Sequence, residues 1–215
     1  MNNLLDQRKI GIIVGALVIV GAGIWFFQES SEKKNQEGKT ALYQVQQTFD
    51  TEYNALLPAE REIGAKVDID SKLPKTVTAL NGLLSAKTFS HHTLFEAGVK
   101  LGSLYLDHGS AEKAATVFKN TTQFAGSSFQ KASGFYLLAT AQERASQFKE
   151  ALASYQESMN EGVEGLKGDD LLGMVRMSIK LGDKERAKLF LEKLNKEVPG
   201  SKAAETADSL VKGAA

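Results

Sequence analysis

The chain has 215 residues, and its 26 basic and 26 acidic side chains cancel to a formal net charge of zero. This balance gives no indication of binding to nucleic acid or of broad electrostatic adhesion to lipid. Cysteine is absent, which excludes disulfide bonds, thiolate metal sites, a cysteine nucleophile and a lipid-modified cysteine. Proline occurs only three times, whereas alanine, leucine, lysine and glutamate are abundant, and this composition favours helices over sheet.

The first predicted element is a membrane-spanning helix, Ile10–Phe27. Its eighteen residues carry no charge, and a helix of this length extends about 27 Å, close to the roughly 30 Å of a bilayer's hydrocarbon core. A cleaved signal peptide is the alternative, with a cut after Gly21-Ala22-Gly23. A retained anchor is preferred because signal peptides usually have about 7–15 apolar residues. The run also ends in Trp25-Phe26-Phe27, an aromatic cluster typical of a membrane interface.

Residues 1–9 form a short tail in front of the predicted span, and charge does not settle which side of the membrane they occupy. Arg8 and Lys9 precede the span, while Lys33, Lys34 and Lys39 follow it, so the two sides are nearly balanced. A tail this short is easily left in the cytoplasm. This favours a large domain that faces outward.

Residues 28–37 are predicted to form a charged connector, and residues 38–89 an atypical first helix pair with an irregular insertion. The irregular stretch runs from Pro58 to Leu73, and Pro74 suits the first turn of the second helix. Ser90-His91-His92 is a break. In the first helix, Gly38–Leu57, one apolar stripe recurs at spacings of three and four residues: Leu42, Val45, Phe49 and Tyr53.

Residues 90–215 carry a repeated pattern that predicts three helix pairs and a C-terminal capping helix. Close helix crossings need small residues, so Gly102, Ala139 and Ala151 are expected contact points. A period of 36 or 37 residues is typical of a solenoid, in which stacked pairs bury a continuous core. In each copy an alanine lies twelve residues after a small or slim residue: Ala114 after Gly102, Ala151 after Ala139, and Ala187 after Val175.

In two of the pairs, a glycine predicts the turn that joins the first helix to the second. Gly109 and Gly182 each lie five residues before the repeat alanine, where a left-handed helix end favours glycine. Ser110 and Asp183 follow them as expected N-cap residues. Asp169-Asp170 is expected to begin a helix, because acidic residues are favoured in a first turn.

The first repeat copy reads Leu101-Gly102-x2-Tyr105 and then Ala114-x3-Phe118. This pattern resembles the tetratricopeptide repeat (TPR), except that Gly98 stands where that family often has tryptophan. The resemblance implies an all-α fold, a right-handed α-solenoid of stacked helix pairs, here preceded by one transmembrane helix.

The order of an anchor, a charged connector, a broken first pair and three further pairs is similar to the YfgM-like family. That family is the ancillary periplasmic subunit of the bacterial Sec translocon. The resemblance implies a bacterial inner-membrane location with a periplasmic C-terminal domain. It also implies two partners, the Sec translocon and a membrane-anchored peptidyl-prolyl isomerase chaperone.

The sequence offers little for catalysis or for binding a metal or cofactor. His91-His92 lies in a break between helices, with no carboxylate or further histidine at metal-ligand spacing. Asp68-Ile69-Asp70 lacks the glycine and the distal glutamate of a calcium loop. We therefore expect no catalytic residue, cofactor, metal site or small-molecule substrate. An enzyme whose site assembles from distant residues is the less favoured alternative.

The remaining candidate for function is a surface on the first helices of the pairs, which line the concave side of a helix-pair solenoid. A groove rich in arginine and tyrosine suits an extended peptide or a partner's tail. The alternative is that these charged faces are merely solvated. The candidate partner-binding residues are Ser103, Leu106, Asp107, Tyr136, Thr140, Glu143, Arg144, Arg176, Ile179 and Lys180.

Together these features predict a non-enzymatic, membrane-anchored adaptor that docks another protein of the bacterial cell envelope, near the protein-export or chaperone machinery. The alternative of the same broad kind is a scaffold for envelope biogenesis, cell division or a secretion system. Neither hypothesis involves nucleic acid.

Overall fold

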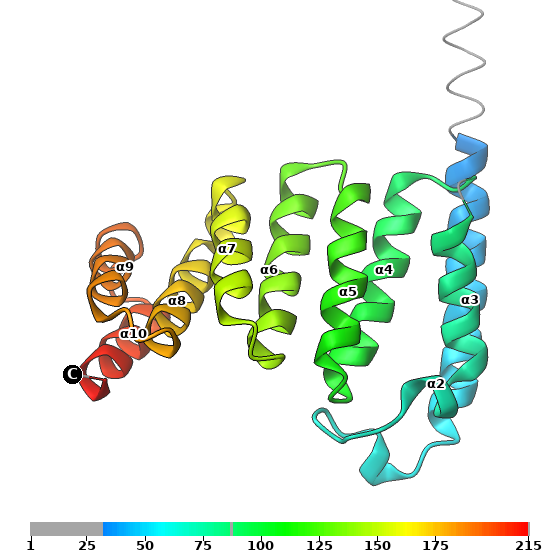
Figure 1. The fold of residues 1–215 in the computed structure, drawn as a ribbon. Coiled ribbons are helices and arrows are strands. Elements are labelled where there is room, and N and C mark those ends of the chain that lie inside the picture. Colours follow the sequence, from blue (N-terminus) through cyan, green and yellow to red (C-terminus); the bar gives the residue numbers. More distant parts are fainter. Residues whose placement is uncertain (1–31, 87, 215) are drawn as a thin grey trace, which may run out of the picture.

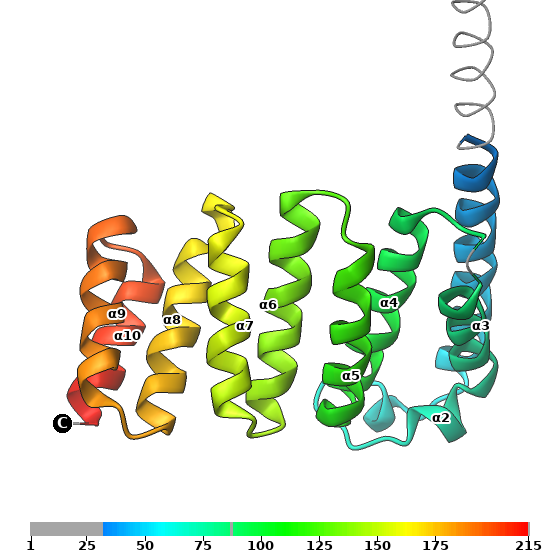
Figure 2. The ribbon, with the colours of Figure 1, turned by 45° about the horizontal axis from the view of Figure 1, so that its top comes forward.

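The computed structural model describes residues 32–86 and 88–214, and every regular element in these ranges is a helix. The helices stand side by side in one row (Figures 1 and 2), which confirms the predicted all-α architecture of stacked helix pairs. After a first helix over residues 32–54, the elements are η1 (Pro58–Glu60), α2 (Ile69–Lys72), α3 (Pro74–Ser85), α4 (His91–Asp107), α5 (Ala111–Thr121), η2 (Thr122–Phe124), α6 (Ser128–Arg144), α7 (Phe148–Asn160), α8 (Glu164–Lys180), α9 (Lys184–Glu197) and α10 (Lys202–Gly213).

Three helix pairs make up most of the row: α4 with α5, α6 with α7, and α8 with α9. The last helix, α10, packs against both α8 and α9. Helix 32–54 and α3 lie at one end of the row, and α9 and α10 lie at the other (Figure 1). None of the helices described has the length and apolar composition needed to cross a bilayer. The predicted span, Ile10–Phe27, lies outside the described residues.

The first helix starts earlier and ends earlier than the predicted Gly38–Leu57. Residues 32–37, which were expected to belong to the connector, are already helical, because their glutamate and lysine side chains are good helix formers. Gly38 does not begin the helix but lies inside it, packed against Thr93 of α4. At the other end, the Arg61 guanidinium donates hydrogen bonds to the carbonyls of Asn54 (2.7 Å) and Leu56 (2.8 and 3.0 Å), which stabilises the chain reversal there.

The irregular stretch after this helix contains a short helix, α2, that the sequence did not predict. Ile69 of α2 is almost fully buried, so one apolar anchor holds this turn in place. Glu52 of the first helix then caps α3, because its carboxylate accepts hydrogen bonds from the backbone N–H of Lys75 (3.0 Å) and of Thr76 (2.9 Å). Partial burial acts to raise the pKa of Glu52. The hydrogen bonds from the Thr76 hydroxyl and from the two backbone N–H groups outweigh this effect and hold the pKa below its ordinary value.

The predicted turn glycines adopt the expected left-handed backbone. Gly109 has φ of 81° and Gly182 has φ of 76°, while Ser146 takes the matching position of the second pair with φ of 59°. Asp183 caps α9 by accepting a hydrogen bond from the backbone N–H of Arg186 (3.0 Å). Ser110 precedes α5 as predicted, but its side chain makes no capping hydrogen bond.

Asp169-Asp170 does not begin a helix, and that prediction is wrong. α8 begins at Glu164, so Asp170 lies in its second turn, where it is buried against α7. The Ser158 hydroxyl donates a hydrogen bond to Asp170 Oδ2 (2.9 Å), whereas Oδ1 has no partner among the described residues. Burial therefore raises the pKa of Asp170 to about 7, an effect that the Ser158 hydrogen bond reduces and the neighbouring charge of Asp169 increases.

Close contacts between glycine and an aromatic ring set the spacing of the helices. A Cβ atom added to Gly102 would collide with the ring of Phe118, and one added to Gly173 would lie 2.5 Å from Cζ of Tyr155. Ala151, a predicted contact point, is fully buried. Tyr155 thus fills the space between α7 and the first helix of the next pair, since Gly173 belongs to α8.

The glycine contacts predict opposite effects for two single-methyl additions. Gly173→Ala should lower the free energy of unfolding by about 1–3 kcal/mol, because the new methyl group overpacks against Tyr155. Gly82→Ala is the matched control: Gly82 is exposed in α3, where an added Cβ meets no described atom within 4 Å. Its better helix propensity should raise the free energy of unfolding by about 1 kcal/mol. Chemical denaturation measures both; shifts of the same sign would show that the contact is not a constraint.

The buried Asp170 predicts a pH-dependent stability. The pKa of its carboxyl group is about 7 in the folded protein against the ordinary 3.8, so the folded state retains a proton that the unfolded state loses, and the free energy of unfolding falls as pH rises between these values. Asp170→Asn stays neutral throughout. The melting temperature of the variant minus that of the parent should therefore increase from pH 4 to about pH 7 and stay constant above it. Asp169→Asn, at the exposed neighbour, should show a much smaller trend, because it removes only the minor contribution of that charge to the pKa of Asp170. A constant offset for Asp170→Asn would contradict the assignment.

Candidate protein-binding groove

Two of the ten sequence-predicted binding residues bond to each other at the junction of α6, α7 and α8. Arg176 donates two hydrogen bonds to the Glu143 carboxylate, each 2.8 Å long. Tyr155, which the sequence analysis did not propose for this surface, donates from its hydroxyl to Glu143 (2.8 Å) and accepts from Arg176 (3.3 Å). Glu143 and Arg176 therefore make most of their hydrogen bonds within the protein and have few left for a partner.

The electrostatics of this cluster favour its charged form. Hydrogen bonds and charge from Glu143 raise the pKa of the Arg176 guanidinium despite its partial burial, so the guanidinium stays charged. Burial, together with the Glu143 charge, raises the pKa of the Tyr155 hydroxyl, which remains a donor. Tyr136 lies edge-on to Tyr155 with 5.9 Å between ring centroids, and Thr140 donates a hydrogen bond to the Tyr136 carbonyl (2.9 Å). This arrangement joins three helices, which is a structural role.

The other candidates differ in their exposure to solvent. Leu106 is 6 % exposed and belongs to the apolar core, so its prediction as a binding residue is wrong. Its carbonyl accepts a hydrogen bond from the Arg144 guanidinium (3.2 Å), which ties α6 to the end of α4. Lys180 is exposed. Ser103, Asp107 and Ile179 are half-buried, and nothing in the contacts tests whether they bind a partner.

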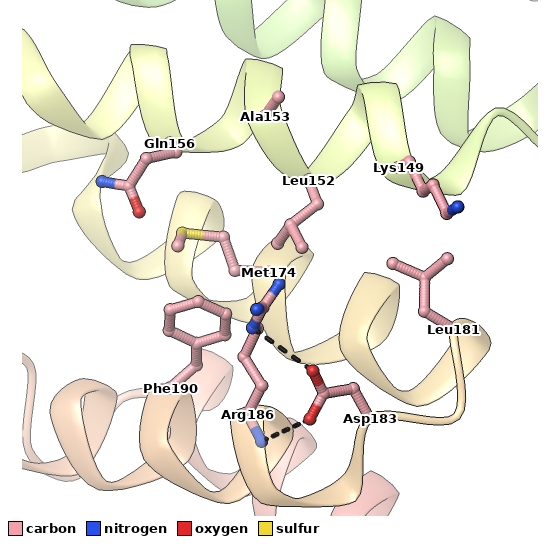
Figure 3. A pocket seen from close by; sticks show the side chains of 9 residues that line it. All are labelled: Lys149, Leu152, Ala153, Gln156, Met174, Leu181, Asp183, Arg186 and Phe190. Atoms are coloured by element: carbon pink, nitrogen blue, oxygen red, sulfur yellow. Dashed lines mark hydrogen bonds and ion pairs between the residues drawn. The ribbon is translucent and has the colours of Figure 1, made fainter.

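A groove lies instead on the second-helix side of the last two pairs, between α7 and α9, with α8 behind it in the view of Figure 3. Its volume is about 630 Å³, which is in the range of natural binding pockets. Its apolar lining comes from three helices and one flanking residue: Leu152 and Ala153 of α7, Met174 of α8, Leu181 directly after α8, and Phe190 of α9. We call this feature the α7–α9 groove.

The polar lining of the α7–α9 groove comes from Lys149 and Gln156 on one wall and from Asp183 and Arg186 on the other. Arg186 extends between the apolar side chains, and its Nε lies 3.4 Å from Asp183 Oδ2 (Figure 3). Asp183 is also engaged by its capping bond to the Arg186 N–H. No carboxylate within the described ranges pairs with Lys149, so the groove presents an apolar floor with excess positive charge.

This groove faces away from the predicted surface. Met174 and Leu181, the residue that caps the end of α8, are seven residues apart and so project from one side of this helix, whereas Arg176 and Lys180 project from the opposite side. The sequence analysis missed the groove because it followed the similarities between repeats. A difference between the repeats could have indicated it. When the copies are aligned on their repeat alanines, Leu152 corresponds to Ala115 of the preceding copy, and Phe190 corresponds to Ser154.

The described part of the chain contains no arrangement suited to a metal ion. Nowhere in residues 32–86 and 88–214 do three or more histidine or carboxylate side chains come together. His92 lies 3.1 Å from Glu96 and 3.0 Å from the Gln130 amide, which is a surface contact between α4 and α6.

Comparison with known proteins shows the fold but not a family. No protein-family model matches the chain, and no curated protein does. The crystal structure of MamA is similar, with a TM-score of 0.52 and 20 % sequence identity over 68 % of this chain and 84 % of that one. At this identity the likeness concerns the fold alone, a TPR-like stack of helix pairs. The resemblance to the YfgM-like family stays a prediction.

Proposed function

We propose that the chain is a membrane-anchored helical-repeat adaptor, without enzymatic activity, that binds another protein of the bacterial cell envelope. The observation that carries this proposal is the α7–α9 groove. Leu152, Leu181 and Phe190 are only partly buried there, so a partner that covers them gains the free energy of removing apolar surface from water. The polar rim around this floor supplies orientation and specificity.

The proposed anchor is Ile10–Phe27, which places the protein in the inner membrane with its helical domain in the periplasm. Helix 32–54 lies at the opposite end of the row from α9 (Figure 1). A membrane anchor that precedes helix 32–54 would therefore leave the groove accessible. The resemblance to the YfgM-like family supports the Sec translocon and a membrane-anchored peptidyl-prolyl isomerase chaperone as the partners. A scaffold for envelope biogenesis, cell division or a secretion system is the alternative.

The membrane assignment predicts two outcomes for the full-length protein. It should remain in the membrane fraction after alkaline carbonate washing, because an apolar helix of bilayer length is not displaced by high pH. A reporter enzyme that is active only outside the cytoplasm, fused after Ala215, should be active. Release by carbonate would contradict the anchor, and activity only of a cytoplasm-dependent reporter would reverse the orientation.

The groove assignment predicts position-dependent crosslinking to a partner. A benzophenone side chain in place of Ala153, which is exposed inside the groove, should capture one envelope protein in intact cells, identified by mass spectrometry. The same side chain at Thr116 of α5 is the matched control, because Thr116 is exposed at the corresponding repeat position but lies outside the groove. Equal capture at both positions would show that the groove is not the binding site.

The identity of the captured protein decides between the two kinds of adaptor. A Sec translocon subunit or a peptidyl-prolyl isomerase supports the export hypothesis. A division or secretion-system component supports the alternative. Ala153→Arg, which fills the groove without removing a buried side chain, should reduce co-purification of that protein in mild detergent, and Thr116→Arg should not.

A further inference from the structure

We infer that the α7–α9 groove takes a short amphipathic helix of the partner, with apolar residues on the groove floor and a carboxylate beside Lys149. This inference rests on the proposed function that the groove binds a protein. It adds the chemistry and the secondary structure of the bound segment.

The lining of the groove favours a helix over an extended strand. Leu152, Met174, Leu181 and Phe190 offer no hydrogen bonds, and the walls are helices whose backbone groups are already paired. An extended segment laid on this floor would leave its buried N–H and C=O groups without partners, which is costly. A helix satisfies its own backbone and presents only side chains to the floor.

The length of the groove limits the segment to about two turns. On α7, the lining residues run from Lys149 to Gln156, and seven steps of about 1.5 Å give about 10 Å along the axis. Two turns of a helix present apolar side chains at i, i+3 or i+4, and i+7. The two or three apolar residues of such a segment match the three half-buried apolar side chains of the groove, Leu152, Leu181 and Phe190.

The charge of the groove selects an acidic segment. Lys149 has no acidic partner among the described residues, and the only lining carboxylate, Asp183, is engaged by Arg186. The positive charge at this repeat position is specific to α7. The position of Lys149 is occupied by Glu112 in α5 and by Glu185 in α9. A carboxylate one turn from the apolar residues would meet Lys149 at the rim, where complementary charge improves specificity.

The test is selection from a library of displayed twelve-residue peptides by the full-length protein in detergent. The enriched peptides should combine apolar residues at helical spacing with aspartate or glutamate within one turn of them. Their affinity should fall about tenfold for Lys149→Glu, because attraction becomes repulsion. Lys119→Glu is the matched control, since it makes the same charge change on the exposed face of α5 and should leave affinity unchanged.

A second selection against the Lys149→Glu variant sharpens the test. Lysine or arginine should now replace the acidic residue, while the apolar spacing stays the same. Enriched peptides that keep their acidic residue, or that lose affinity equally with Lys119→Glu, would overturn the role of Lys149. Enrichment of peptides rich in proline, or of none at all, would overturn the helical segment.

The outcomes separate the failure of this inference from that of the proposed function. Non-acidic or non-helical peptides whose binding is abolished by Ala153→Arg would refute the inferred chemistry and leave the groove as a protein-binding site. Acidic helical peptides that bind Ala153→Arg as well as the parent would refute the groove itself. Crosslinking from position 153 to a second copy of this chain would show that the ligand is the protein itself. That result would refute the existence of a separate partner at this groove.

Discussion

The rest of the structure depends on how closely one helix can approach the next. At Gly102 and Gly173 the missing side chain leaves just enough room for the rings of Phe118 and Tyr155. Because the helices stand in one row, each such contact fixes the position of the pairs that follow it. The contact at Gly173 also places the Tyr155 hydroxyl beside Glu143, and Glu143 in turn binds Arg176. A packing constraint thus decides which polar groups meet.

The general architecture could be predicted from the sequence because its signals are local. Apolar periodicity, the repeat alanines and the left-handed turns at Gly109 and Gly182 each depend on a few neighbouring residues. The burial of Leu106 and the pairing of Glu143 with Arg176 could not, because these depend on which faces of separate helices come together. The prediction that Asp170 lies at the start of a helix was wrong for a related reason. An acidic residue is typical of a first helical turn, but this helix begins six residues earlier, at Glu164.

The candidate site could not be predicted because a repeat protein carries its specific chemistry where the copies differ. The positions that make the stack, such as Ala114 and Ala151, are alike because they satisfy the same packing geometry. The α7–α9 groove lies between two neighbouring second helices. It carries large apolar side chains because Leu152 and Phe190 stand where the corresponding positions of the preceding repeats have Ala115 and Ser154. The stacking of the helix pairs, a fold shared with MamA at 20 % identity, is common to all the copies.

The size of the groove is consistent with the proposed membrane anchor. A two-turn segment covers far less surface than the roughly 1,200–2,000 Å² of a stable protein–protein interface, so its affinity alone is low. A partner held in the same membrane meets the groove at a high effective concentration, because both proteins are confined to one plane. Under this proposal the span, Ile10–Phe27, and the groove contribute to one binding event. The groove alone would then hold a partner only weakly, which is the behaviour expected of an adaptor that must release its partner as well as hold it.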